Sequence, residues 1–297
     1  MVAKKFYQIR TARTDMEERL NLAAEKHVVV MGVFEQMTAG GARLLEEAGK
    51  LGRVRVLLLA DDLAVRLTGR APQFPLDERR YVTVAVRWVD EVRSVTALDD
   101  LHRLPGLEGS GAAAWVVDEV SDHPAKRAFC AAAGLGYHVV SQAALETLPS
   151  EPVEILPARA GRKKAVVTGC YDWLHSGHVR FFEEAAELGD LYVVVGNDAS
   201  VRFLKGDGHP LFGQAVRRYL VGAMRTVHQA LITSGMGWLD AEPEIAQIKP
   251  DVYVVNEDGD KPEKRAFCEA HGLAYAVLKR LPRPGLARRT STDLRGF

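Results

Sequence analysis

The stretch Gly169-Cys-Tyr-Asp-Trp-Leu-His-Ser-Gly-His178 decides the fold of this chain. It follows a short apolar, β-branched run, Lys163-Lys-Ala-Val-Val-Thr168, which predicts a buried strand. Apolar residues then recur at helical spacing up to Gly189, and Leu191-Tyr-Val-Val-Val195 predicts a second strand. The stretch is therefore the loop of a β-α-β unit. Because such crossovers are right-handed, the loop opens at the carboxyl end of a parallel sheet.

This loop has the features of an anion-binding site. Free backbone N–H groups and the positive end of the helix dipole meet at the start of the helix. Gly169 and Gly177 have no side chains, so a phosphate group can approach the backbone closely. His175 and His178 lie three residues apart and flank Gly177, so both imidazoles can face one bound group. We expect this histidine pair to hold phosphate oxygens.

The pattern Gly-x-Tyr-Asp-x-Leu-His-Ser-Gly-His resembles the motif of the cytidylyltransferase-like nucleotidyltransferases. In that superfamily a strand-loop-helix carries His-x-Gly-His and holds the phosphates of a nucleoside triphosphate. Four matching letters arise by chance, but here the preceding residues, a strand and a helix accompany them. The resemblance covers Lys163 to Phe297 closely, and Glu25 to Val140 as fold only.

Composition narrows the class of protein. A chain of 297 residues that is 47% apolar and 26% charged is typical of a globular protein of one large or two ordinary domains. Zero formal net charge gives no electrostatic case for nucleic acid or an anionic membrane as partner. No signal peptide and no membrane-spanning run are recognisable. Three cysteines form no disulfide framework, so we expect a cytoplasmic location.

A second copy of the pattern lies earlier in the chain. Lys26-His-Val-Val-Val-Met-Gly32 matches the run that ends at Gly169, with an offset of 137 residues. Lys126-Arg-Ala-Phe-Cys130 recurs letter for letter as Lys264-Arg-Ala-Phe-Cys268, with an offset of 138 residues. A period this long indicates a duplicated domain. The two repeated cysteines fall on predicted helices, and we expect both to pack in cores.

We therefore predict an α/β protein of two tandem Rossmann-like domains, each a parallel sheet flanked by helices, packed as a pseudo-dimer. The predicted borders are an N-terminal extension at 1–24, a degenerate nucleotidyltransferase-like domain at 25–147, a proline-punctuated linker at 148–164, and a catalytic domain at 165–297. Where the second copy has His175-Ser-Gly-His178, the first has Thr38-Ala-Gly-Gly41. The first copy lacks both imidazoles, so we expect it to be non-catalytic.

The resemblance implies further site residues in the second copy. Lys205, beside Gly206, stands at the family position that reaches the triphosphate. A solvated loop lysine is the alternative, and the neighbouring glycines favour the functional role. Arg288-Arg-Thr-Ser-Thr-Asp-Leu294 resembles the family's Arg-Thr-x-Gly-Ile-Ser-Thr-Thr motif without its Gly-Ile, where an ordinary helix N-cap is the alternative. The predicted catalytic residues are His175, His178, Lys205 and Arg289. The predicted nucleotide-binding residues are Gly169, Cys170, Tyr171, Asp172, Gly177, Arg217, Asn256, Glu257, Thr290, Ser291 and Thr292.

One helical segment differs between the copies in its acidic residues. Residues 216–228 resemble the family's Glu-Arg…Arg-Tyr-Val-Asp segment but have Val216 in place of the glutamate, whereas the first copy keeps it as Glu78. In related dimers this segment lies near the subunit contact. We therefore hypothesise that Arg79 or Arg87 of the first copy supports the active second copy. The chain would then be a monomeric pseudo-dimer or a homodimer.

The inferred reaction is nucleotidyl transfer. The resemblance implies that a small phosphorylated acceptor, an alcohol or sugar phosphate, attacks the α-phosphorus of a nucleoside triphosphate, that pyrophosphate leaves, and that Mg²⁺ accompanies the triphosphate. The C-terminal Arg-Thr-Ser-Thr favours CTP. The tandem domains also resemble ethanolamine-phosphate cytidylyltransferases, although that family keeps histidines in its first repeat. Residues 196–210 resemble the ADP-heptose type of sugar-phosphate nucleotidyltransferase and point to ATP. We expect CTP, with ATP as the alternative.

Two other classes of protein share parts of this pattern. Class I tRNA synthetases have a histidine-bearing loop, but this chain has no Lys-Met-Ser-Lys-Ser-like loop and no basic charge excess. A nucleotide-sensing binding protein would fit a chain with one degenerate domain. The retained His175, His178, Lys205 and Arg289 favour an enzyme.

Overall fold

The computed structural model describes residues 27–106, 111–152, 154–279 and 281–290. The predicted N-terminal extension, and the predicted site residues Ser291 and Thr292, lie outside these ranges. No helix within the described ranges is long and apolar enough to cross a membrane.

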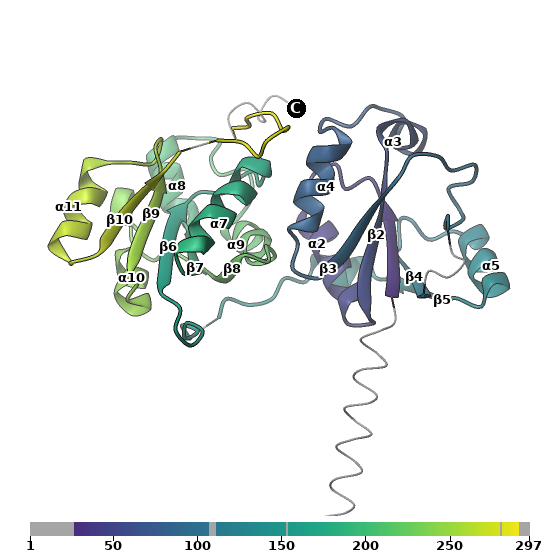
Figure 1. The fold of residues 1–297 in the computed structure, drawn as a ribbon, viewed down its shortest axis with the longest axis horizontal. Coiled ribbons are helices and arrows are strands. Elements are labelled where there is room, and N and C mark those ends of the chain that lie inside the picture. The colour runs from purple at the N-terminus through teal and green to yellow at the C-terminus, as the bar shows by residue number, and fades with distance from the viewer. Residues whose placement is uncertain (1–26, 107–110, 153, 280, 291–297) are drawn as a thin grey trace, which may run out of the picture. The chain divides into compact units, whose positions relative to one another are not determined.

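The described chain contains two five-stranded parallel sheets of the same topology (Figure 1). The strand order is β3-β2-β1-β4-β5 in the first and β8-β7-β6-β9-β10 in the second, so the first strand of each copy lies at the centre. The first sheet and its helices are β1 (His27–Gly32), α2 (Ala39–Gly49), β2 (Arg53–Leu59), α3 (Asp61–Thr68), α4 (Leu76–Val84), β3 (Val89–Val95), β4 (Ala112–Asp118), α5 (Pro124–Ala133), β5 (Gly136–Val140) and α6 (Gln142–Glu146).

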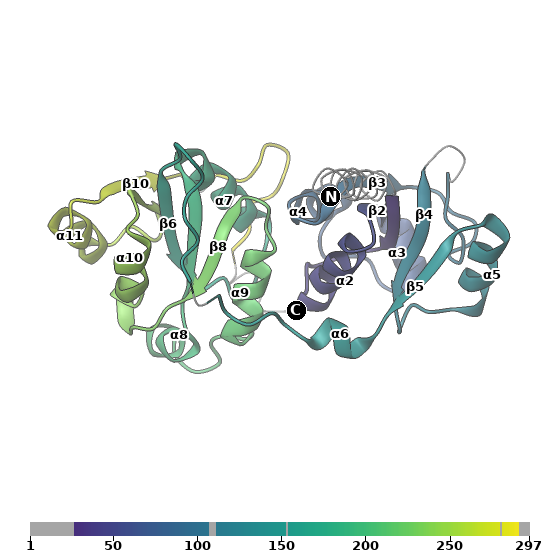
Figure 2. The same cartoon turned by 90° about the horizontal axis from the view of Figure 1, so that it is seen from below.

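The second sheet repeats this order of elements. It comprises β6 (Lys164–Gly169), α7 (Ser176–Leu188), β7 (Asp190–Val195), α8 (Asp198–Lys205), α9 (Gln214–Gly222), β8 (Val227–Ile232), the 3₁₀ helix η1 (Gly237–Leu239), α10 (Glu242–Ile248), β9 (Val252–Asn256), α11 (Pro262–Ala270) and β10 (Ala274–Leu278). Helices α7 and α9 cover one face of this sheet, and α10 and α11 cover the other (Figure 2). The predicted α/β class with two Rossmann-like sheets is confirmed.

The chain divides into two compact units whose borders do not follow the sequence copies. The first unit contains β1 to β5. The second contains β6 to β10 and also takes in two segments of the first copy, Glu35–Ala42 and Asp77–Arg87. The predicted domain borders and the predicted pseudo-dimer packing stay predictions.

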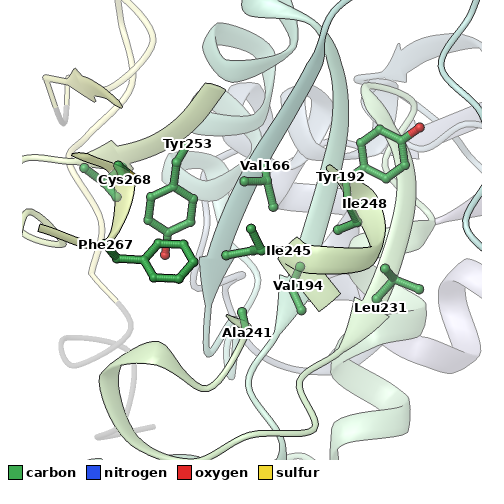
Figure 3. Packing of buried hydrophobic residues seen from close by; sticks show 11 residues of the cluster. Val166, Tyr192, Val194, Leu231, Ala241, Ile245, Ile248, Tyr253, Phe267 and Cys268 are labelled. Atoms are coloured by element: carbon green, nitrogen blue, oxygen red, sulfur yellow. The ribbon is translucent and has the colours of Figure 1, made fainter. Parts of the chain in front are cut away.

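Each unit has its own hydrophobic core. In the second unit, Val166, Val194 and Leu231 of the sheet pack against α10 and α11 (Figure 3). Cys268 on α11 is 1% exposed in this core, and Cys130 on α5 is 1% exposed in the core of the first unit. Burial raises the pKa of both thiols, that of Cys268 to about 11. Both cysteines therefore serve packing, as predicted.

A polar contact outside the cores is also repeated in both copies. Asp122 accepts hydrogen bonds from the Arg127 guanidinium at 3.0 Å and the Tyr137 hydroxyl at 2.9 Å. At the corresponding positions, Asp260 accepts from Arg265 at 2.8 Å and from the Tyr275 hydroxyl at 3.0 Å. A repeated contact of this kind, added to the repeated strand order, supports the duplication inferred from the sequence.

Candidate nucleotide-binding site

A cavity of about 270 Å³ lies at the carboxyl ends of the central strands of the second sheet. Its volume is close to the lower end of the roughly 300–1,000 Å³ typical of small-molecule sites. It is lined by Thr168, Gly169, Cys170, Tyr171, Asp172, His175, Gly177, His178, Phe181, Lys205, Val255, Asn256, Asp258, Gly259, Lys264 and Thr290. Ten of the predicted site residues are in this set. Arg217, Glu257 and Arg289 are not.

The loop after β6 is shaped by one aromatic side chain. Tyr171 has a φ of +52°, which turns its ring back over Gly169. A Cβ at Gly169 would lie 2.8 Å from the Tyr171 ring, so a side chain there would collide with it. The ring also packs against His178, with ring centroids 5.3 Å apart, and against Phe182 at 5.2 Å. The space at Gly169 is therefore occupied by Tyr171, which supports His178 from behind.

The two histidines face each other at the start of α7. His175 is the N-cap of this helix and is 2% exposed, and its Nδ1 accepts a hydrogen bond from the backbone N–H of Gly177 at 3.1 Å. Because Nδ1 accepts, the proton of the neutral ring is on Nε2, which is then a hydrogen-bond donor. The His178 ring stacks on His175 with centroids 3.9 Å apart. Both rings line the cavity, as the motif predicted.

Glycine is required between these histidines. A Cβ at Gly177 would lie 2.9 Å from Cε1 and 3.0 Å from Nδ1 of His175. Such a contact would push the imidazole out of its capping position. Gly177 therefore allows a histidine to cap the helix and still lie against the cavity.

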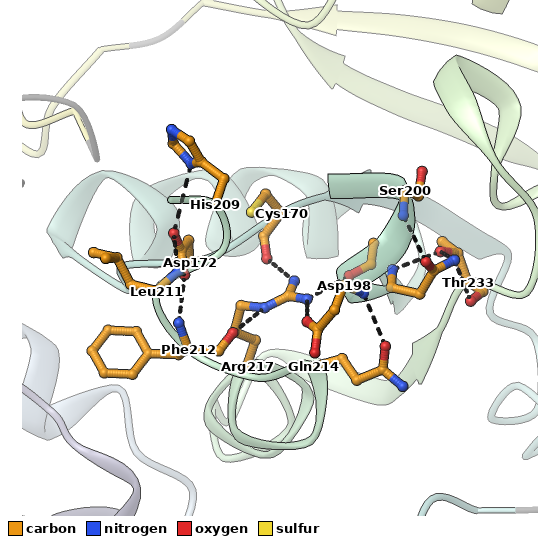
Figure 4. A network of polar contacts seen from close by, with 12 residues as sticks. Cys170, Asp172, Asp198, Ser200, His209, Leu211, Phe212, Gln214, Arg217 and Thr233 are labelled. Atoms are coloured by element: carbon orange, nitrogen blue, oxygen red, sulfur yellow. Dashed lines mark hydrogen bonds and ion pairs between the residues drawn. The ribbon is translucent and has the colours of Figure 1, made fainter. Parts of the chain in front are cut away.

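A buried polar network anchors the loop that carries this site (Figure 4). The carboxylate of Asp172 accepts hydrogen bonds from the backbone N–H groups of Leu211 at 2.8 Å and Phe212 at 2.9 Å. Arg217, which is fully buried, donates to the carbonyl of Cys170 at 2.6 Å and to the carboxylate of Asp198 at 2.6 Å. Asp172 and Arg217 thus hold the loop in place, and the Arg217 guanidinium is directed at protein groups.

Two cations line the cavity. Lys205, the last residue of α8, is exposed. Lys264 on α11 is only 8% exposed, and its Nζ lies 3.4 Å from Oγ1 of Thr168. Burial lowers the pKa of Lys264, and the nearby carboxyl of Asp240 opposes this shift. Burial also raises the pKa of the Cys170 thiol in this cavity, although the charge of Lys205 acts in the opposite direction.

Sequence reasoning missed Lys264 as a cavity residue. Asp258, a candidate together with Asn256 and Glu257 for contacting base or acceptor, lines the cavity. Lys264 was recognised only as the first letter of the repeated Lys-Arg-Ala-Phe-Cys segment. The signal that could have found it is its place near the N-terminus of the helix that follows β9, a strand of the same sheet edge. In the first copy the corresponding Lys126 donates to the carbonyl of Ser121 at 2.7 Å.

The two described site residues near the C-terminus, Arg289 and Thr290, lie in different surroundings. Thr290 lines the cavity. The guanidinium of Arg289 donates instead to the carboxylate of Glu78, with Nη2 at 2.8 Å.

The two predicted residues at the end of β9 also differ. Asn256 lines the cavity, whereas the backbone N–H of Glu257 donates to the carbonyl of Leu278 at 3.0 Å. Among the described residues, no three His, Cys, Asp or Glu side chains are placed to hold a metal ion.

Comparison with known proteins matches residues 166–272 to the family described as Cytidylyltransferase-like. A bifunctional protein HldE of Campylobacter concisus is 40% identical over 110 residues, which are 36% of this chain and 23% of that protein. The HldE of Desulfatibacillum aliphaticivorans is 30% identical over 217 residues, which are 71% of this chain and 44% of that protein. This chain thus spans less than half the length of these HldE relatives.

A shorter relative is matched over most of its length. The FAD synthase of Aciduliprofundum boonei is 32% identical over 119 residues, which are 39% of this chain and 76% of that protein. The matched family region contains the loop after β6, the histidine pair and most of the cavity. The chain therefore belongs to the cytidylyltransferase-like nucleotidyltransferase superfamily.

Proposed function

We propose that this protein transfers a nucleotidyl group from a nucleoside triphosphate to a small phosphate-monoester acceptor. The observation that carries the proposal is the stacked pair of His175 and His178 at the N-terminus of α7, in a cavity that also contains Lys205 and Lys264. Two imidazoles, a helix N-terminus and two ammonium groups around one cavity form a site for a highly charged anion.

The reaction needs no covalent enzyme intermediate. An oxygen of the acceptor phosphate forms a bond to the α-phosphorus, the bond from that phosphorus to the bridging oxygen breaks, and pyrophosphate leaves with the electron pair. Charge builds up on the phosphoryl oxygens as this happens. The Nε2–H of His175 and the ring of His178 would stabilise that charge by hydrogen bonding, and α7 would add its N-terminal dipole.

The two lysines would contact different parts of the triphosphate. Lys205 is exposed on a flexible stem, which suits a contact to the leaving pyrophosphate. Lys264 is buried beside Thr168, so it would be ordered before the substrate binds. The family resemblance gives the leaving pyrophosphate to Lys205 and Arg289, together with the backbone near Ser291. Because the Arg289 guanidinium contacts Glu78, we assign this task to Lys205 alone among the described side chains.

The residues of the cavity fit a magnesium ion held mainly by the nucleotide. Mg²⁺ commonly binds one or two carboxylates together with substrate phosphates and water. The cavity offers two carboxylates, and that of Asp172 already accepts two backbone N–H groups. Asp258 is the remaining carboxylate in the lining. When bound, the ion would neutralise phosphate charge, and Asp258 is the residue of this chain that would contact it.

For the nucleotide we propose ATP in place of the expected CTP. One relative is an FAD synthase, and FAD carries an adenylyl group. Residues 196–210 resemble the ADP-heptose type of sugar-phosphate nucleotidyltransferase, and they include α8 and the cavity residue Lys205. The residues that favoured CTP include Ser291 and Thr292, which lie outside the described ranges. A sugar phosphate is the proposed acceptor, and the cytoplasm stays the predicted location.

Pyrophosphate release by the full chain tests this proposal. ATP, CTP, GTP and UTP are each supplied with Mg²⁺ and one of a panel of acceptors: hexose 1-phosphates, heptose 1-phosphates, glycerol 3-phosphate, ethanolamine phosphate and FMN. We expect release with ATP and a sugar phosphate, at least tenfold faster than with CTP. Preferential turnover of CTP would contradict the nucleotide assignment. Tight nucleotide binding without turnover of any pair would contradict the enzyme assignment and indicate a sensor.

A further inference from the structure

Glu78, on α4 of the first copy, lies in the second compact unit together with the nucleotide site. Its carboxylate is 2% exposed. It accepts a hydrogen bond at 2.6 Å from the hydroxyl of Ser176, which is the first residue of α7 and stands between the two histidines in the chain. It also accepts from Nε of Arg289 at 3.1 Å and from Nη2 at 2.8 Å.

This carboxylate therefore joins two segments that border the cavity. Through Ser176 it holds the start of α7, where His175 and His178 are displayed. Through Arg289 it holds the C-terminal segment, whose next residue, Thr290, lines the cavity. The two segments are themselves close, because a Cβ at Gly177 would lie 3.6 Å from the Arg289 carbonyl oxygen.

A buried ion pair of this kind depends on both partners. Glu78 is almost fully buried, and the Arg289 side chain is 25% exposed. A buried carboxylate is stable only when it is paired and hydrogen-bonded, and Ser176 and Arg289 supply three donors between them. Removing the carboxylate charge would break the ion pair with Arg289 and would release both segments.

The corresponding positions of the other copy show why this contact concerns the active site. Where the second copy has Ser176 the first has Ala39, and where the first copy has Glu78 the second has Val216. The equivalent Ser–Glu pair would have linked the first copy's loop to the second copy's helix. Neither member is present: the serine position is Ala39 in the first copy, whose loop also lacks both histidines, and the glutamate position is Val216 in the second copy.

The backbone segments that follow α4 and α9 also contact each other, and they do so symmetrically. The N–H of Arg87 donates to the carbonyl of Ala223, and the N–H of Arg225 donates to the carbonyl of Ala85, both at 2.8 Å. Val86 and Met224 form an isolated antiparallel bridge between them. The two hydrogen bonds are equivalents of each other, and the bridge joins equivalent positions of the two copies. This reciprocal contact lies next to the helix that carries Glu78.

We propose that Glu78, contributed by the first copy, is a positioning residue of the nucleotide site in the second copy. It fixes Ser176 and Arg289 before the nucleotide binds, and thereby fixes the histidine pair and Thr290. The degenerate copy is thus required for the site although it has no histidines of its own. This inference rests on the proposed function for its effect on turnover, but its structural part is tested without turnover.

The first experiment measures hydrogen exchange in the full chain without nucleotide. Glu78→Gln removes the charge and keeps the shape of the side chain, and Asp77→Asn is the matched control because Asp77 is the exposed neighbouring carboxylate on α4. We expect Glu78→Gln to speed exchange at least tenfold in peptides covering residues 173–181 and 283–290, with Asp77→Asn unchanged. Unaltered exchange in both peptides of the Glu78→Gln protein would overturn the proposal.

The second experiment measures turnover with the nucleotide and acceptor found active. We expect Glu78→Gln to lower kcat/KM for the nucleotide by about 10–100-fold, since a displacement of about 1 Å at an active site costs up to about 10²-fold. Asp77→Asn should stay within about twofold. Ser176→Ala removes the same hydrogen bond from the other side, and its effect should not add to that of Glu78→Gln.

These outcomes separate the two proposals. A lower melting temperature for Glu78→Gln with unchanged kcat/KM would show a structural role only and overturn the positioning role. If Glu78→Gln fails to fold, Ser176→Ala takes its place in both experiments, with the same expected direction. If the wild-type chain turns over no nucleotide, the proposed function fails, and hydrogen exchange alone decides whether Glu78 positions the two segments.

Discussion

The loop after β6 and the loop after β1 share two backbone features and differ in their side chains. Tyr171 and Phe34 occupy equivalent positions, and both have a positive φ, of +52° and +44°. His175 caps α7 through Nδ1 at 3.1 Å, and Thr38 accepts a hydrogen bond through Oγ1 from the N–H of Gly41 at 3.0 Å. The frame of the loop is therefore kept in both copies, while the imidazoles are present in one. Fold alone does not indicate an active site here.

The largest expected effect comes from removing an imidazole from the second loop. We expect His178→Ala to lower turnover by roughly 10²–10³-fold, the effect of losing one hydrogen-bond donor to a transition state. The matched control is His102→Ala, because His102 stacks on His123 in the first unit with ring centroids 3.9 Å apart. That control should leave turnover within about twofold. A loss of tenfold or less for His178→Ala would remove His178 from the mechanism.

A smaller effect is expected at the glycine that separates the two histidines. Gly177→Ala places a methyl group 2.9 Å from the His175 ring, whereas the equivalent Gly40 on α2 has nothing within 4 Å of a Cβ. We expect Gly177→Ala to lower kcat/KM by about 10–100-fold, because the imidazole must move. Gly40→Ala should leave turnover unchanged and stabilise its helix by about 0.5–1 kcal/mol. Equal behaviour of the two variants in kinetics and melting would contradict this reading of the loop.

The frame and the motif could be predicted from the sequence, because strands, helices and the His-Ser-Gly-His spacing leave local patterns. The roles of Arg217 and Arg289 could not. Both side chains are arginines near a phosphate motif, and only the folded chain shows that one donates to the Cys170 and Gly196 carbonyls and the other to Glu78. Lys264 was missed for a related reason, because its burial beside the cavity also depends on residues distant in sequence.

The stability of the second unit should depend on pH through a buried carboxylate at the start of β7 that the first copy lacks. Asp190 of β7 is buried, whereas the equivalent residue of β2 is Arg53. The carboxylate of Asp190 accepts hydrogen bonds from the backbone and side chain of Arg159, both at 2.6 Å, and from Arg162 at 3.2 Å. The Arg159 side-chain hydrogen bond is the main cause that holds the pKa of Asp190 well below its usual range.

The sign of the pH effect follows from that direction. A depressed pKa contributes stability above the unfolded-state value of about 3.9, and this stability is lost as the pH falls through that value towards the folded-state pKa. Asp190→Asn should lower the free energy of unfolding at pH 7 by roughly 1–3 kcal/mol and flatten its dependence on pH below about 4. Urea unfolding at pH 7 and pH 3 measures both effects. Asp99→Asn, at an exposed carboxylate of the first unit, is the control. An unchanged slope with pH in Asp190→Asn would refute the assignment.

The smallest expected effect concerns the contact around the Val86–Met224 bridge. Here the two copies are most alike, because equivalent arginines, Arg87 and Arg225, donate to backbone carbonyls. The Arg87 guanidinium donates to the carbonyls of Met224 at 3.2 Å and Val227 at 2.6 Å, and that of Arg225 donates to the carbonyl of Val86 at 3.0 Å. Arg87→Ala should lower the free energy of unfolding by about 1–2 kcal/mol, because two buried carbonyls lose a donor, and Arg225→Ala should do so by a similar or smaller amount.

Turnover should distinguish these variants from a control variant at an exposed arginine. Arg80→Ala, on the same helix as Glu78, should alter neither stability nor turnover, since the Arg80 side chain is exposed. Arg87→Ala should lower turnover by no more than about fivefold, because it acts on the histidine pair only through the placement of Glu78. If Arg87→Ala changed neither the melting temperature nor turnover, the hypothesis that the arginines of the first copy support the second would be wrong. Glu78 would then hold the start of α7 and the C-terminal segment without support from Arg87.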